Sequence, residues 1–391
     1  MNIDNKKIQE VLERNVEQII TKEELLKKMS SGKQLRIKHG VDVTSPMLHL
    51  GHAVNYWKMR EFQEMGHKII FLIGDFTTTI GDPTGKSKTR PEINEVEIKK
   101  NAKDYLRQAA KILINKPKLL EVRRNSEWFG KMKLGGFLSL LKKITHSRLM
   151  ERDMFQDRIK KQEDIYMHET MYPILQAYDS VMLKSDLTII GSDQLFNELI
   201  GRKYQEIFGQ NPQSIITTSI TPGLDGGKKM SKSLGNFVAI ADSPENQFGK
   251  IMTLLDELIQ IYFLVYTKLS LEEIENIKKE KPFEAKKKLA FEIVKIYHGV
   301  DSATKAKNNF EKNFSKREIN EDNLKIYKVQ KGEKWADFLV KENFVKSKTE
   351  AKRLLSGGGV EQKNKKISQN IEITSGIAKI GKYKFVKIDI L

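Results

Sequence analysis

The sequence predicts an α/β fold: a Rossmann-like, doubly wound domain with a parallel sheet, followed by an α-helical domain and a small α+β domain. Three observations support this prediction. Short apolar runs alternate with helix-period segments through the N-terminal half, as crossover helices between parallel strands require. After Asn236 helix-period segments dominate. From Trp335 a helical pattern leads into a glycine turn and then a strand.

Residue patterns place the first strands and helix of the α/β domain. Leu35–Val41 alternates apolar and basic residues, which predicts a strand that runs into the turn 42–46. His52–Met65 has helical periodicity and is followed by a glycine. Two apolar runs predict further strands of the kind buried in parallel sheets, at 69–74 and 188–191.

The C-terminal half reads as two smaller parts. A capping-box pattern begins at Ser270, and Pro282 and Gly299 bracket another helix. A second capping-box pattern begins at Ser347 and opens a basic helix that ends at 357–359. The predicted divisions are an α/β domain at 1–226 with a connective stretch at about 131–165, a lysine-rich loop at 227–240, a helical domain at 241–319, a linker at 320–332 and a small domain at 333–391.

Composition limits the class of protein. The 69 Lys and Arg exceed the 51 Asp and Glu, giving a net charge of +18, which favours a polyanionic partner such as RNA; a general lysine bias of the genome is the alternative. The chain has no Cys, so disulfides and Cys-ligated zinc are excluded. The N-terminus has no apolar signal region and no stretch reaches the roughly 18 apolar residues of a membrane span, so a cytoplasmic, soluble protein is expected.

Two short motifs carry the functional prediction. His49–His52 reads HLGH, and far downstream Lys229–Ser233 reads KMSKS. Either motif alone is weak, because paired histidines on a helix and a lysine-rich turn are both common in solvated surfaces. Their order, flanking residues and separation together are specific. The pair resembles the HIGH and KMSKS signatures of class I aminoacyl-tRNA synthetases, which grip the triphosphate of ATP.

In a doubly wound fold, ligands lie beyond the carboxyl ends of the strands at the switch point, where the predicted strand-to-helix turn places this motif. Gly51 would allow a nucleotide to approach the backbone, and the helix N-terminus would attract phosphate. The resemblance implies that the residues that bind ATP are Asp42, Gly51, His52, Asp193, Lys229 and Lys232.

A second loop, Gly81–Arg90, carries Lys86 and Arg90, which could close over pyrophosphate. Its spacing leaves three residues between Gly81 and Gly85, so it does not match a P-loop. A mobile basic surface loop is the alternative. The residues expected to stabilise charge on the reacting phosphates, acting as electrostatic catalysts, are Thr44, His49, His52, Lys86, Arg90, Lys229 and Lys232.

The predicted amino-acid pocket depends on Tyr172, Gln176 and Asp179, whose i, i+4, i+7 spacing puts them on one helical face. A polar helix surface is the alternative. With 191–194, this segment resembles the substrate pocket of bacterial tyrosyl-tRNA synthetases, a family of homodimers. The resemblance implies that Asp179 accepts a hydrogen bond from the substrate phenol, that Tyr172, Gln176 and Asp82 hold its ammonium group, and that Asp193 binds the ribose. The residues expected to bind tyrosine are Lys38, Asp82, Tyr172, Gln176, Asp179 and Gln194.

Two positions depart from many members of that family. Lys38 stands where a tyrosine is common, as in one bacterial subgroup, and Thr188 replaces a common glutamine. Tryptophanyl-tRNA synthetases are therefore the nearest competing family.

The last domain resembles a small RNA-binding domain first named for a small-subunit ribosomal protein. The resemblance implies phosphate contacts from Lys346, Lys348, Lys352 and Arg353, with a solvated basic helix as the alternative.

The implied reaction is ligation of tyrosine to tRNA(Tyr) through a tyrosyl-adenylate, with ATP and Mg²⁺ and no protein-bound metal site. Two other classes remain open: a synthetase relative that only binds RNA, and a small-molecule nucleotidyltransferase. The intact motifs argue against the first, and the C-terminal RNA module argues against the second.

Overall fold

A computed structural model of the chain describes residues 5–82, 93–227, 229–231, 234–315, 324, 326–342, 344–345, 347–362, 365–381 and 384–390. The chain divides into two compact units, Met1–Lys307 and Asn308–Leu391. Lys86, Arg90, Lys232 and Lys346 lie outside the described residues.

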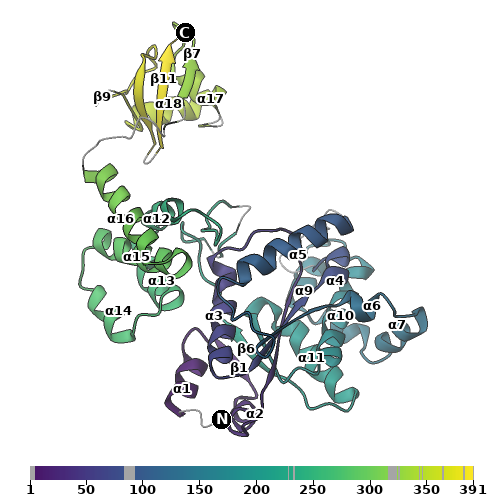
Figure 1. The fold of residues 1–391 in the computed structure, drawn as a ribbon. Helices are drawn as coiled ribbons and strands as arrows, with labels where there is room; N and C mark the ends of the chain where they lie inside the picture. The colour runs from purple at the N-terminus through teal and green to yellow at the C-terminus, as the bar shows by residue number, and fades with distance from the viewer. Residues whose placement is uncertain are drawn as a thin grey trace. The chain divides into compact units, whose positions relative to one another are not determined.

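A six-stranded sheet forms the core of the first unit (Figure 1). The strand order is β1-β6-β5-β2-β3-β4, and every pairing is parallel except that of β1 with β6. The order therefore reverses between β2 and β5, which defines the switch point. The predicted doubly wound α/β fold is confirmed. The strands are β1 (Gln18–Ile20), β2 (Arg36–Val41), β3 (Lys68–Ile73), β4 (Leu120–Arg124), β5 (Leu187–Gly191) and β6 (Ser214–Thr218).

Helices cover both faces of this sheet, with α3 on one side and α10 and α11 on the other (Figure 1). Helix α3 begins at Leu50 rather than at the predicted His52, because His49 keeps an extended backbone and serves as the N-cap. The helices are α1 (Asn5–Glu13), α2 (Lys22–Ser30), α3 (Leu50–Glu64), α4 (Asp75–Ile80), α5 (Glu95–Ala109), α6 (Ser126–Phe129), α7 (Leu134–Leu141), α8 (His146–Met150), α9 (Asp153–Lys160), α10 (Met167–Leu183) and α11 (Leu195–Ile207), with a 3-10 turn η1 at Ser192–Gln194.

From Pro244 to Ser315 the chain is mainly helical, and its last helix begins in the first unit and ends in the second. The capping box at Ser270 is confirmed, because its hydroxyl accepts from the Glu273 amide at 3.2 Å and the Glu273 carboxylate accepts from the Ser270 amide at 2.7 Å. Arg14, the residue after α1, donates to the Leu264 and Thr267 carbonyls and so ties the N-terminal segment to this part. The elements are α12 (Pro244–Met252), η2 (Asp256–Leu258), α13 (Ile259–Tyr266), α14 (Leu271–Ile277), α15 (Pro282–His298) and α16 (Val300–Ser315).

The second unit is a five-stranded sheet covered by two helices around the buried Trp335 and Phe338. Part of the predicted linker belongs to it, because Ile326–Val329 forms an edge strand whose Tyr327 and Val329 side chains enter the core. The elements are β7 (Ile326–Val329), α17 (Trp335–Lys341), α18 (Lys348–Ser356), β8 (Val360–Gln362), β9 (Lys365–Lys366), β10 (Gly376–Ile380) and β11 (Lys384–Ile390). In the described part of the chain, none of the helices has the length and apolarity needed to span a membrane.

Candidate active site

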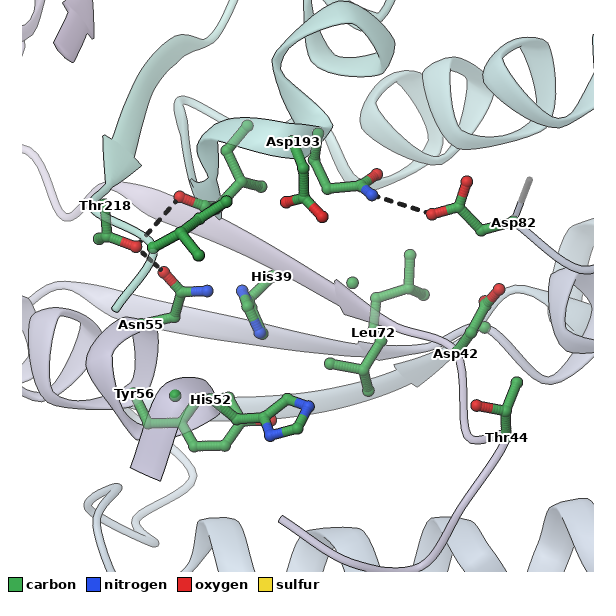
Figure 2. Close-up of a pocket in the computed structure, with 18 of the residues that line it drawn as sticks. His39, Asp42, Thr44, His52, Asn55, Tyr56, Leu72, Asp82, Asp193 and Thr218 are labelled. Carbon is green, nitrogen blue, oxygen red and sulfur yellow. Dashed lines mark hydrogen bonds between the residues drawn. The ribbon is translucent and has the colours of Figure 1, made fainter. Parts of the chain in front are cut away.

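A cavity of about 600 Å³ opens at the carboxyl ends of β2 and β5, at the switch point of the sheet (Figure 2). Residues from both halves of the first unit line it, so the fold collects side chains that are far apart in the sequence. The sequence-predicted residues that line this cavity are Lys38, Asp42, Thr44, His49, Gly51, His52, Asp82, Tyr172, Gln176, Asp179, Asp193, Gln194 and Lys229.

The histidine motif forms the first turn of α3. The His49 amide donates to His52 Nδ1 at 3.3 Å, and the two rings lie 3.9 Å apart between centroids. Gly51 leaves space beside the His49 ring: a Cβ atom there would lie 3.1 Å from that ring and 3.6 Å from the Met230 Cβ. The turn therefore presents two imidazoles and a helix N-terminus to the cavity, a combination suited to phosphate.

Backbone hydrogen bonds join this motif to the chain that follows the KMSKS loop. The Leu50 amide donates to the Val238 carbonyl at 3.0 Å, and the Ile240 amide donates to the Leu48 carbonyl at 2.9 Å. The two signatures are thus parts of one site despite their separation in the sequence.

Asn236 ties the described ends of the KMSKS loop together. Its Oδ1 accepts from the Ser231 amide at 2.8 Å, and its Nδ2 donates to the Asp225 carboxylate at 2.8 Å. Burial raises the pKa of Asp193, and the positive charge of the exposed Lys229 partly offsets this effect. Lys229 of the KMSKS loop and Asp193, which follows β5, therefore line the same cavity.

The predicted phenol acceptor, Asp179, is buried at the end of the cavity. Trp128 Nε1 donates to its Oδ1 at 3.0 Å, and Asn125 Nδ2 donates to its Oδ2 at 3.4 Å. Burial raises the pKa of Asp179 to about 8, although the charge of Lys38 and these two hydrogen bonds lower it. Burial of Asp179 and Tyr172 excludes the alternative of a solvated polar helix surface for this face of α10.

Tyr172 contacts Asp42, a residue predicted to seat the nucleotide. The Tyr172 hydroxyl donates to Asp42 Oδ2 at 3.0 Å, and the Thr77 hydroxyl donates to Asp42 Oδ1 at 2.8 Å. The carboxylate of Asp42 is therefore held between α10 and α4, and it lines the same cavity as His52 (Figure 2).

Asp82 lies at the start of the second basic loop and is held from two sides. Gln194 Nε2 donates to its Oδ2 at 2.9 Å (Figure 2), and Arg152 Nη2 lies 3.6 Å from its Oδ1. Arg152 is buried and comes from the connective stretch, for which the sequence suggested no role. The connective stretch thus reaches the wall of the active site.

Lys38 was expected to contact the amino acid, but its ammonium group is already engaged. It contacts both carboxylate oxygens of Glu198, at 2.9 and 2.8 Å, and the Ser180 hydroxyl at 2.7 Å. Lys38 is only 1% exposed, although it lines the cavity.

Sequence reasoning missed several polar residues of the cavity. The Thr218 hydroxyl donates to Asn55 Oδ1 at 2.6 Å, and both residues lie beside His39 (Figure 2). Burial lowers the pKa of His39 to about 4, so its imidazole is neutral at pH 7. Glu198 was missed too, because the sequence analysis did not predict α11, on whose buried side this charged residue lies. Nothing in the local pattern around Asn55 marks it, because it is one of several polar residues along α3.

The predicted RNA-binding residues that the structure describes lie on α18 in the second unit. Lys352 and Arg353 are exposed, whereas Lys348 Nζ pairs with the Asp337 carboxylate at 2.6 Å. Among the described residues, no group of three or more His, Asp or Glu side chains gathers in a way that could hold a metal ion.

The chain matches a family model described as tRNA synthetases class I (W and Y) over residues 29–315. It is 46% identical to a tyrosine-tRNA ligase of Aquifex aeolicus over 97% of both chains, and 44% identical to one of Thermotoga maritima over 97% of this chain and 96% of that one. Its fold is similar to a solved Archaeoglobus fulgidus tyrosyl-tRNA synthetase complexed with L-tyrosine, with a TM-score of 0.63 and 23% identity over 78% of this chain and 100% of that one.

Proposed function

The chain belongs to the tyrosine-tRNA ligases of the class I tRNA synthetase family, and from this premise we propose how its cavity performs the reaction. The enzyme activates L-tyrosine with ATP to form tyrosyl-adenylate and pyrophosphate, and then transfers tyrosine to the 3′ end of tRNA(Tyr). The observation that carries the proposal is the single cavity lined by both the histidine turn and the Tyr172, Gln176 and Asp179 face of α10.

The first step needs no side-chain nucleophile, because the tyrosine carboxylate itself attacks the α-phosphorus of ATP. The protein has to align the two substrates and stabilise the charge that develops on the phosphates. His49, His52 and Thr44 line the nucleotide side of the cavity and suit this role, and Lys229 adds a positive charge from the opposite motif. Lys86, Arg90 and Lys232 are proposed for the same role from their sequence positions.

Asp179 gives the proposed selectivity for tyrosine over phenylalanine. It is a buried acceptor, and a bound phenylalanine would bring no phenol to donate to it. An unpaired buried polar group is costly, and tyrosyl-tRNA synthetases are themselves a standard example of such discrimination without editing. At the other end of the amino acid, Tyr172, Gln176 and Asp82 are proposed to hold the ammonium group, and Asp193 and Gln194 to line the adenylate.

The second step needs RNA, and we propose that exposed basic residues of α18 contact tRNA phosphates. The net charge of +18 supports a polyanionic partner. Magnesium is proposed to arrive with ATP, held mainly by the phosphates, and to help neutralise their charge. We further propose a homodimer that works in the cytoplasm.

ATP–pyrophosphate exchange measured with each amino acid separately, without tRNA, tests the activation step. Exchange with tyrosine alone is expected. Exchange with tryptophan would assign the chain to the sister enzyme, and no exchange with any amino acid would favour the protein that only binds RNA. Lys232→Ala is expected to slow adenylate formation far more than it weakens tyrosine binding, and equal losses in both would contradict its proposed role.

A further inference from the structure

A buried ion pair lies in the wall of the amino-acid pocket and has no part in the proposed chemistry. The side chains of Lys38 and Glu198 are only 2% and 1% exposed. Removing two charges from water is expensive, and an apolar pair of the same size would often stabilise a fold as well or better. The position of this pair therefore calls for an explanation other than stability.

Glu198 also receives two amide donors. Gln176 Nε2 donates to its Oε1 at 2.7 Å, and Gln213 Nε2 donates to its Oε2 at 2.7 Å. An ionised carboxylate can only accept hydrogen bonds. Gln176 must therefore turn its NH₂ group toward Glu198 and its carbonyl oxygen away from it.

The fixed orientation continues along a chain of amides. Asn197 Nδ2 donates to the carbonyl oxygens of Gln176 at 2.8 Å and Gln194 at 3.1 Å, and Gln194 Nε2 donates to Asp82. A carboxylate stands at each end of this chain, so the orientation of every amide in it is determined. Gln176, Gln194 and Asp82 all line the cavity, whereas Asn197 is fully buried behind them.

Lys38 is placed to hold the Glu198 carboxylate in position, because its ammonium group contacts both carboxylate oxygens. Its neighbour across the sheet is Thr188, which carries no charge and donates its hydroxyl to the Lys38 carbonyl at 3.3 Å. The charge partner of Lys38 therefore comes from α11 and not from the adjoining strand.

We propose that Glu198, paired with Lys38, is a positioning residue that sets the affinity for the amino acid. It holds the Gln176 amide so that the second lone pair of its carbonyl oxygen, and not an N–H, is available to the ammonium group of tyrosine. This inference rests on the proposed function, in which Gln176 contacts that ammonium group.

Glu198→Gln tests the proposal, since it keeps the shape but offers Gln176 both a carbonyl and an NH₂. The KM for tyrosine in ATP–pyrophosphate exchange is expected to rise roughly tenfold or more, with the KM for ATP changing less than about twofold. Asn197→Ala interrupts the same chain without touching the ion pair, so it is expected to raise the tyrosine KM as well.

The double variant Lys38→Met/Glu198→Gln separates positioning from stability. Glu198→Gln alone leaves the buried Lys38 ammonium group without its carboxylate partner, and the double variant removes that charge. Its melting temperature is therefore expected to return toward the wild-type value, while its KM for tyrosine stays high. Lys58→Met is the matched control: Lys58 is equally buried and pairs with Glu61 at 2.6 Å, but neither residue lines the cavity, so its tyrosine KM should match the wild type.

A folded Glu198→Gln enzyme with the wild-type KM for tyrosine would overturn the positioning role. So would a double variant that recovers both melting temperature and tyrosine KM, because the pair would then be only structural. Failure of the wild-type enzyme to show any tyrosine-dependent exchange would instead refute the proposed function on which the inference rests.

Discussion

At the scale of single residues, Gly51 constrains the histidine turn of the cavity. A Cβ atom at this position would lie 3.1 Å from the His49 ring, which is closer than ordinary van der Waals contact. Gly51→Ala is therefore expected to displace the His49 imidazole and to raise the KM for ATP in pyrophosphate exchange roughly tenfold. This change corresponds to a loss of about 1.4 kcal/mol in the free energy of ATP binding. The KM for tyrosine should not change.

Gly249→Ala is the matched control for that substitution. Gly249 lies in helix α12, and a Cβ atom there would meet nothing within 4 Å. This variant should keep both KM values and gain about 0.4–1 kcal/mol in free energy of unfolding. If both substitutions changed the KM for ATP equally, the close contact between residue 51 and the His49 ring would not be the cause.

Asp179 gives a prediction about pH. Its pKa is raised from 3.8 to about 8 by burial, so between these values the native state binds the proton more tightly than the unfolded state. The stabilisation from protonated Asp179 is therefore complete below the lower value and is lost as pH rises through the upper one. The free energy of unfolding of the wild type, measured relative to Asp179→Asn without ligands, should fall from about pH 5 to about pH 8.

Above the upper pKa the difference should become constant, because the carboxyl group no longer titrates. Urea unfolding of both proteins across this range measures it. A difference that increases with pH would mean that the carboxylate is the form that the empty pocket prefers.

At the scale of elements, the KMSKS loop depends on Asn236. This side chain is 5% exposed and bonds both the Ser231 amide and the Asp225 carboxylate. Asn236→Ala removes both hydrogen bonds, which should destabilise this conformation of the loop by about 1–3 kcal/mol. The expected result is a slower exchange reaction with an unchanged KM for tyrosine. An equal rise in the tyrosine KM would mean that the loop also shapes the amino-acid pocket.

The sequence predicted the elements better than it predicted the contacts between them. Apolar runs and caps placed β2, β3, β5 and α15, and the start of α14, within a residue or two, because periodicity and capping are local properties. The linker prediction was wrong at Ile326–Val329, since a short edge strand with only two inward side chains gives little signal.

In the candidate site, too, the sequence predicted individual residues better than the contacts between them. Side chains that the family motifs name were found from the sequence, and the family assignment is confirmed by the close relatives. The partners of Asp42 and Lys38 could not be found, because Tyr172 and Glu198 reach them only through the packing of α10 and α11. The residue roles themselves stay predictions.

At the scale of the whole molecule, activation of tyrosine should need only the first unit. Every described residue of the cavity lies before residue 232, and α16 ends at Ser315. A chain cut after Ser315 keeps that helix whole, so it should retain ATP–pyrophosphate exchange and lose most aminoacylation of tRNA(Tyr). Loss of exchange in a folded truncated protein would show that the second unit supports the active site.

The basic helix α18 gives a finer test of RNA binding. Lys352→Ala and Arg353→Ala should each raise the KM for tRNA and weaken its dependence on salt, because each removes one exposed positive charge. Lys348→Ala should have a smaller effect, since that lysine is already paired with Asp337. Aminoacylation at two salt concentrations measures all three, and identical effects would mean that the ion pair opens when tRNA binds.

The backbone joint between the two signatures also governs hydrogen exchange. The Leu50 amide is bonded to Val238, and the Ile240 amide to Leu48, so neither proton can exchange until the two segments part. Amides distant in the sequence should therefore exchange with one common opening free energy. Their deuteration rates would measure how firmly the nucleotide site is assembled before any substrate enters it.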